Sequence, residues 1–163
     1  MNKTGVIYGI NGPVVYLKGN TGFKMSEMVY VGKERLVGEV IALTKDTTTV
    51  QVFEETTGLK PGETVTASGD ALSVTLGPGI LNNIFDGIER PLSEIAKQSG
   101  KYISRGLTVD SLDTEKKWDV HVTVSEGEEL MGGAIIAETQ ETRSIVHKSM
   151  VPPDVNGTVI WAA

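Results

Sequence analysis

Apolar and polar residues alternate along short segments of the first 70 residues, which is the pattern of β-strands with one buried face. The expected strands lie within residues 4–18, at 28–31, at 36–44 and 47–53, and at 63–68. An Asn11-Gly12-Pro13 corner and a Lys45-Asp46 tip mark two of the turns between them. Five or six short strands in about 65 residues predict a small, closed, six-stranded β-barrel, because closure removes edges that would pair with other chains.

Residues 76–91 divide the chain into two halves. Gly77, Pro78 and Gly79 end the preceding strand, since proline lacks an amide donor and glycine accepts positive φ at low cost. The apolar residues that follow recur at helical spacing, at Ile80, Leu81, Ile84, Phe85 and Ile88. We therefore expect a short helical connector here, an interpretation that composition favours over a ligand-binding loop. A further helix is expected from Pro91 to the Ser99-Gly100 pair.

The chain changes character after residue 100. Residues 101–117 are polar and charged, and four strand-like segments follow them, at 118–124, 130–139, 143–151 and 158–161. The last of these stops soon after it begins, so we expect the chain to be a segment of a longer protein. The whole pattern predicts an all-β fold with a barrel at 1–70, a connector with a short helix at 71–100, and an incomplete second β lobe at 101–163.

Charge and composition exclude several classes of function. The net charge is −6, from 15 Lys and Arg against 21 Asp and Glu, and the basic residues are scattered, so nucleic acid is not an expected partner. The absence of cysteine excludes disulfides, thiolate nucleophiles and Cys-ligated metals, and fits a reducing cytosolic compartment. The longest uncharged run, residues 71–85, is too short to insert into a membrane, where a span needs about 20 residues.

No set of residues has the spacing of a catalytic, cofactor-binding or metal-binding site, and none is predicted. The Gly32-Lys33 and Gly100-Lys101 pairs are followed by Glu34 and Tyr102, and not by the serine or threonine that a phosphate-binding P-loop requires. His121 and His147 are far apart and have no cysteine or carboxylate at metal-ligand spacing.

Two groups of carboxylates also fall short of a site. Asp110, Asp113 and Glu115 lack the glycine and late glutamate of a Ca²⁺ loop, and a solvated loop is the expected structure. Asp86 and Glu89 are a candidate acid and base pair, but no His, Lys or Tyr stands at a useful spacing from them.

Four pieces of the chain carry a resemblance to a known family, in that family's order. They are residues 5–15; residues 37–41 and 51–59; residues 76–81 and 85–92; and residues 102–107, 112–118 and 147–159. The first three resemble the opening barrel and linker of rotary ATPase head subunits. The fourth resembles the insertion, called the bulge or non-homologous region, that distinguishes the A subunit. The chain is thus similar to the start of the catalytic A subunit, or alpha chain, of V/A-type rotary ATPases.

This resemblance implies a parent that couples ATP synthesis or hydrolysis to H⁺ or Na⁺ transport and uses Mg-ATP. In the family the P-loop, the water-activating glutamate and the helical domain all lie beyond Ala163, so no cofactor is expected in this segment. The resemblance implies B subunits of the hexameric head as partners, with stalk subunits as further candidates. It also implies a cytoplasmic location, peripheral to the membrane. Residues 4–68 would form the barrel of the head and residues from 101 onward the bulge.

Two other classes of function remain open at this point. Residues 124–160 resemble the barrel-sandwich hairpin of biotinyl and lipoyl carrier domains, but a carrier needs a lysine at the hairpin tip for acylation. The expected tip, residues 138–142, contains none. The chain could also be a free-standing interaction module with no enzyme attached.

Overall fold

The computed structural model describes residues 3–162 and is mostly β-structure with one short helix. The chain forms two compact units. The barrel unit contains the residues up to Val74 together with Phe85–Val109, and the second unit contains Thr75–Ile84 together with the residues from Asp110 onward.

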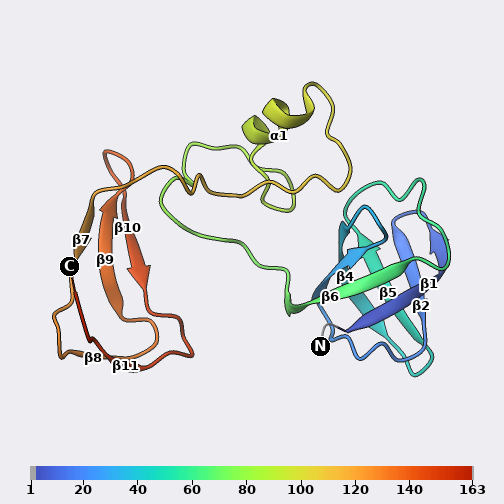
Figure 1. Cartoon of the computed structure of the whole chain (residues 1–163), viewed down its shortest axis with the longest axis horizontal. Helices are drawn as coiled ribbons and strands as arrows, with labels where there is room; N and C mark the ends of the chain where they lie inside the picture. Colours follow the sequence, from blue (N-terminus) through green and yellow to red (C-terminus); the bar gives the residue numbers. More distant parts are fainter. Residues whose placement is uncertain (1–2, 163) are drawn as a thin grey trace. The chain divides into compact units, whose positions relative to one another are not determined.

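Six antiparallel strands form a closed barrel in the barrel unit (Figure 1). They are β1 (Thr4–Asn11), β2 (Val14–Lys18), β3 (Glu27–Val31), β4 (Leu36–Leu43), β5 (Thr47–Val52) and β6 (Thr64–Ala71). The order around the barrel is β1-β2-β5-β4-β3-β6, with β6 pairing back onto β1. The predicted six-stranded barrel is therefore confirmed, and the Asn-Gly-Pro corner joins β1 to β2 as expected.

The barrel core is built from the inward-facing residue of each alternating pair. In β2, for example, Val15 and Leu17 are fully buried while Val14 and Tyr16 are half-buried on the other face. The core consists mainly of β-branched and leucine side chains, which suit a pleated, buried surface. Its members are Ile7, Val15, Leu17, Phe23, Val29, Val31, Leu36, Val40, Val50, Val52, Val65 and Ala67.

The connector differs from the predicted helix over residues 80–88. These residues form turns, with one isolated bridge between Phe85 and Pro91. Asn82 and Glu89 have positive φ values of 67° and 64°, which a right-handed helix cannot contain. The Asp86 side chain also binds nearby backbone amides, and such local bonds compete with helix formation. The expected second helix is confirmed as α1 (Leu92–Ser99), which buries Ile95 and ends at Gly100.

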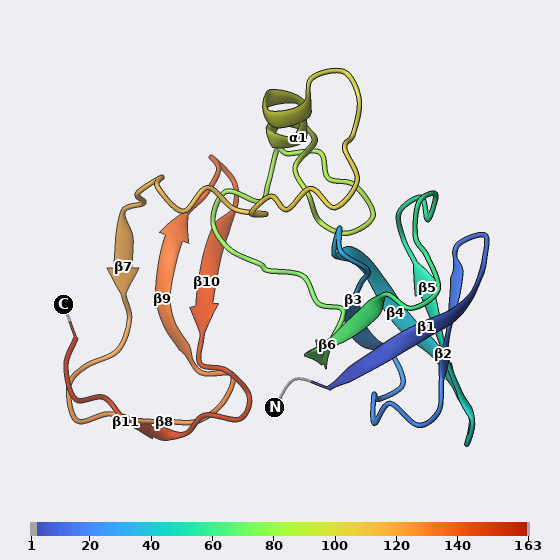
Figure 2. The ribbon, with the colours of Figure 1, turned by 45° about the vertical axis from the view of Figure 1, so that its right-hand side comes forward.

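The second unit contains two small sheets (Figure 2). Its strands are β7 (Val120–Val122), β8 (Glu129–Leu130), β9 (Ile135–Gln140), β10 (Val146–Met150) and β11 (Gly157–Thr158). One sheet has the order β10-β9-β7, and the other pairs β11 with β8. The single strand expected over 130–139 is divided by a turn in which the Ala134 amide donates to the Met131 carbonyl.

The two units divide the chain differently from the predicted boundaries. The predicted connector at 71–100 splits, because Thr75–Ile84 belongs to the second unit and Phe85 onward to the barrel unit. The predicted second lobe begins at residue 101, whereas residues up to Val109 belong to the barrel unit. Glu141 binds the amides of Gly79 and Leu81 within the second unit, and Arg90 binds the Leu107 carbonyl within the barrel unit, which accounts for both differences.

Candidate functional site

The best-defined polar cluster of the barrel unit consists of Glu54, Asp86 and Arg90, here called the Arg90 cluster. Glu54 follows β5, and the other two residues lie in the turn before α1. One oxygen of Asp86, Oδ1, accepts hydrogen bonds from the amides of Ile88 and Arg90, at 3.1 and 2.9 Å. The Asp86 amide in turn donates to the Arg90 carbonyl at 3.1 Å. This tight turn sets the position of the guanidinium.

The Arg90 guanidinium is buried and bridges three parts of the barrel unit. Its Nε donates to Asp86 Oδ2 at 2.7 Å, and its Nη1 donates to the Leu107 carbonyl at 3.0 Å. Nη1 also lies 3.5 Å from Glu54 Oε2. The Arg90 and Glu54 side chains are only 9% and 8% exposed, so the pairing takes place away from water. A buried charge needs a partner of opposite charge, because burying it alone raises the free energy of the folded state.

Residues 105–107 complete the cluster from the far end of the unit. The Gly106 amide donates to Glu54 Oε2 at 3.0 Å, the same oxygen that faces Arg90. Arg105 contacts the Thr57 carbonyl and the Glu34 carboxylate. A Cβ at Gly106 would collide with the Glu34 carbonyl oxygen, so only glycine permits this close approach. The cluster therefore fastens residues 86–107 to the barrel.

Two opposing effects act on the pKa of Asp86. Burial raises it, but hydrogen bonds from the Arg90 amide, the Arg90 guanidinium and the Ile88 amide, together with the charge of Arg90, outweigh burial. The net result is an Asp86 pKa below the ordinary value of 3.8. Asp86 is thus held as a carboxylate that is paired with the Arg90 guanidinium. A carboxylate held in this way is unsuited to proton transfer at neutral pH.

The sequence points to part of this cluster and not to the rest. The sequence makes Asp86 a candidate catalytic carboxylate paired with Glu89, but the structure pairs it with Arg90, four residues further on. That spacing is visible in the sequence as a possible ion pair. The contribution of Glu54 is not visible in the sequence, because only the fold brings the residues after β5 close to Arg90.

The two histidines do not come together in the second unit. His121 on β7 stands opposite Glu138 of β9, whereas His147 on β10 stands opposite Thr139, so the two rings lie on different faces of the sheet.

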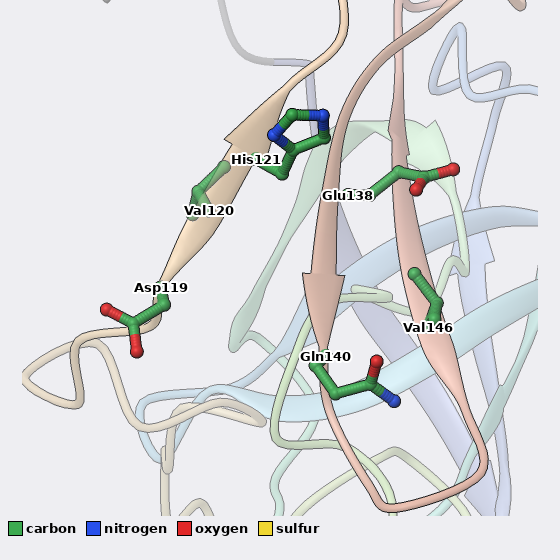
Figure 3. Close-up of a pocket in the computed structure, with 6 residues that line it drawn as sticks. All are labelled: Asp119, Val120, His121, Glu138, Gln140 and Val146. Atoms are coloured by element: carbon green, nitrogen blue, oxygen red, sulfur yellow. The ribbon is translucent and has the colours of Figure 1, made fainter.

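A hollow on this sheet is lined by Asp119, Val120, His121, Glu138, Gln140 and Val146. Glu138 shares a face of the sheet with His121, but Figure 3 shows its side chain extending toward β10, where its carboxylate lies 3.7 Å from the Lys148 ammonium. Within residues 3–162, no three metal-ligating side chains gather closely enough to hold an ion.

The acidic loop at Asp113 has a local structural role. Its Oδ1 accepts the amides of Glu115 and Lys116 at 3.0 and 3.2 Å, which closes a turn. The Lys116 ammonium lies 3.9 Å from the centre of the Trp118 ring.

The two Gly-Lys pairs do not fit the phosphates of Mg-ATP. The Lys33 amide donates to Glu63 Oε2 at 3.0 Å, and the Gly32 amide donates to the Thr64 carbonyl, so these donors already face protein oxygens. Gly100 stands at the C-terminal end of α1, where the helix dipole is negative and disfavours an anion. Neither position supplies the amide cradle at a helix N-terminus that phosphate requires.

Comparison with known proteins identifies the class to which these two units belong. Residues 7–69 match the β-barrel domain of the ATP synthase alpha/beta family, and residues 109–163 match the barrel-sandwich domain of ATP synthase alpha/beta subunits. In chain order, the two matches cover most of the barrel and the part of the second unit from Asp110 onward. The chain belongs to the ATP synthase alpha/beta family.

Curated relatives from bacteria and archaea narrow this class to one kind of polypeptide. The chain is 51% identical over 160 residues to the V-type ATP synthase alpha chain of Halothermothrix orenii, covering 98% of this chain and 27% of the relative. It is 52% identical over 155 residues to V-type ATP synthase alpha chain 2 of Clostridium tetani, covering 95% and 26%. It is also 52% identical over 159 residues to the A subunit of the A-type ATP synthase of Methanopyrus kandleri, covering 98% and 27%. The chain spans about a quarter of the length of these relatives.

These matches confirm the resemblance to V/A-type A subunits and favour it over the carrier interpretation. The barrel-sandwich match explains why the second unit resembles carrier domains in architecture. The hairpin tip lies at residues 141–145, between β9 and β10, rather than at 138–142. It contains Arg143 and no lysine, so it offers no amine for acylation. Among the described residues, no helix has the length and apolar character needed to cross a membrane.

Proposed function

We propose that this chain is the assembly portion of the catalytic A (alpha) subunit of a V/A-type ATP synthase. Its barrel joins the barrels of B subunits in the hexameric head, and its second unit forms the bulge, where stalk subunits are further candidate partners. The complete subunit binds Mg-ATP and couples ATP synthesis or hydrolysis to H⁺ or Na⁺ transport at the cytoplasmic face of a membrane. The observation that carries the proposal is identity of about 50% to named A subunits along nearly the whole chain.

The barrel surface supports a role in assembly. A closed barrel has no free strand edge, so a partner cannot bind by adding a strand to it and outward-facing side chains are the surface available on the strands. Val6 and Tyr8 on β1 are 54% and 51% exposed, although both are large and apolar. The Tyr8 ring lies 6.2 Å from that of Tyr16 on β2, which extends the apolar surface across two strands. Exposed aromatic residues of this kind are enriched where proteins associate.

Co-expression with a B subunit tests this proposal. We expect the chain to co-purify with the B subunit, and Tyr8→Lys to weaken the complex by about tenfold or more, because it places a charge in an apolar contact. The matched control is Met25→Lys, at another exposed apolar position of the barrel unit, 56% exposed. Equal binding by the two variants, or no complex with wild type, would contradict the proposed interface.

A further inference from the structure

The chain crosses between the two units three times. It leaves the barrel unit after Val74, returns to it at Phe85, and leaves again after Val109. The stretch between the barrel and α1 is therefore not one linker, because its first part, Thr75–Ile84, belongs to the second unit. Some contact must hold this part there, since its sequence is uncharged and rich in glycine and asparagine.

One carboxylate oxygen makes two hydrogen bonds to this part of the chain. Glu141 Oε1 accepts hydrogen bonds from the amides of Gly79 and Leu81, at 2.8 and 2.9 Å. The Asn83 side chain also donates to the Gly79 carbonyl at 2.7 Å, which closes the loop on itself. Hydrogen bonds to an ionised acceptor are roughly twice as strong as neutral ones. Two of them on one oxygen therefore fix the loop more firmly than ordinary turn contacts would.

The loop formed by Thr75–Ile84 packs within the second unit, and the β9–β10 hairpin tip at 141–145 has its own hydrogen bonds. A Cβ at Gly77 would lie 2.6 Å from Leu112 Cδ1, so the loop lies against the residues that begin the rest of the second unit. At the tip, the amides of Glu141 and Thr142 donate to the Ile145 carbonyl, at 3.1 and 3.2 Å. The Gln140 side chain donates to the Thr142 carbonyl at 2.6 Å. These bonds order the backbone of the tip without help from the loop, so the tip places the Glu141 side chain where it can reach the Gly79 and Leu81 amides.

We propose that Glu141 is a latch that makes the Gly-Pro-Gly loop an integral part of the second unit. The Arg90 cluster does the same for residues 86–107 in the barrel unit. Together they confine the backbone freedom between the units to the three junctions at 74–75, 84–85 and 109–110. Three chain crossings of this kind restrict a hinge more than one flexible linker does. The inference rests on contacts within each unit and holds whether or not the barrel binds a partner.

Residue-resolved hydrogen exchange on the 163-residue chain tests the latch. In Glu141→Ala, the Gly79 and Leu81 amides are expected to exchange about tenfold faster or more, because a hydrogen bond to a charged acceptor is lost from each. Glu141→Gln keeps an acceptor oxygen without the charge and should give an intermediate rate. The β9 amides serve as the internal measure of folding, and their protection should not change.

Glu138→Gln is the matched control. Glu138 lies in the same hairpin, and its carboxylate faces Lys148 of β10. The Glu138→Gln variant should leave the exchange rates of the Gly79 and Leu81 amides unchanged. Unchanged protection of these two amides in a folded Glu141→Ala variant would overturn the proposal, as would equal loss of protection in Glu138→Gln.

Discussion

Replacing Arg90 by methionine is expected to destabilise the barrel unit by about 3–5 kcal/mol, the range found when one partner of a buried ion pair is removed. The variant leaves Asp86 and Glu54 without their cation in a site where Arg90 and Glu54 are only 9% and 8% exposed. Glu54 Oε1 is already buried without a hydrogen-bond partner, so without Arg90 the Glu54 carboxylate would keep only the Gly106 amide, on Oε2. Urea unfolding followed through exchange of the Val50 amide, in the barrel core, measures the change.

The same variant should respond differently to pH. The Asp86 pKa is depressed in the folded protein, so its contribution is present above the unfolded value of about 4 and is lost as the pH falls through the folded value. In Arg90→Met the guanidinium hydrogen bond and the arginine charge that lower this pKa are lost, while the backbone amides of residues 88 and 90 remain. The gap in stability between wild type and Arg90→Met should therefore narrow when the pH is lowered from about 7 toward about 3.

Lys97→Met is the control for Arg90→Met. It removes the same charge from the same unit, but Lys97 is 71% exposed and pairs with Glu94 on the surface of α1. Exposed pairs contribute about 1 kcal/mol or less. If Arg90→Met lowers the free energy of unfolding as little as Lys97→Met does, the Arg90 cluster does not hold residues 86–107 on the barrel.

Leu36→Ala is expected to cost about 2–5 kcal/mol of barrel stability. Leu36 begins β4, is fully buried, and belongs to the cluster that fills the barrel. Its truncation removes apolar contact and leaves a cavity that the closed strands cannot collapse to fill. The free energy of unfolding, obtained from denaturant titration, measures the loss.

Leu43→Ala supplies the comparison, since it makes the same substitution in the same strand. Leu43 is 38% exposed and lies outside the core cluster. Its truncation should cost about 1 kcal/mol or less. Similar costs at the two positions would mean that the barrel interior is not packed as described.

The barrel could be predicted from the sequence because burial there is local and periodic. Val15 and Leu17 alternate with outward-facing neighbours, and the Asn11-Gly12-Pro13 corner marks the turn between their strand and the one before it. Each strand carries its own evidence of the buried face. The closed arrangement then follows from the number of short strands and the cost of free edges.

The helix predicted for the connector is wrong because its apolar spacing competes with stronger local chemistry. Ile80, Leu81, Ile84 and Phe85 do follow helical spacing, but Asn82 adopts positive φ and Asp86 binds the amides ahead of it. Hydrophobic periodicity records which residues could share a face, and it does not record the side-chain hydrogen bonds that favour turns.

The contacts that fasten the connector were beyond sequence reasoning for a different reason. Glu54 reaches Arg90 and Gly106, and Glu141 reaches Gly79 and Leu81, across long stretches of chain. Each is one of many glutamates in the sequence, and nothing local distinguishes it. Only the fold shows which carboxylate meets which amide, and this is why the unit boundaries differ from those predicted.

A chimera tests the central claim most directly. The matching segment of the Halothermothrix orenii alpha chain, which is 51% identical over 160 residues, would be replaced by this chain and expressed with the remaining head subunits. We expect the chimera to assemble with B subunits and to retain ATP hydrolysis, and the same chimera carrying Leu36→Ala to assemble less. A chimera that folds, as shown by protected barrel amides, but does not assemble would contradict the role proposed for this chain in assembling the head.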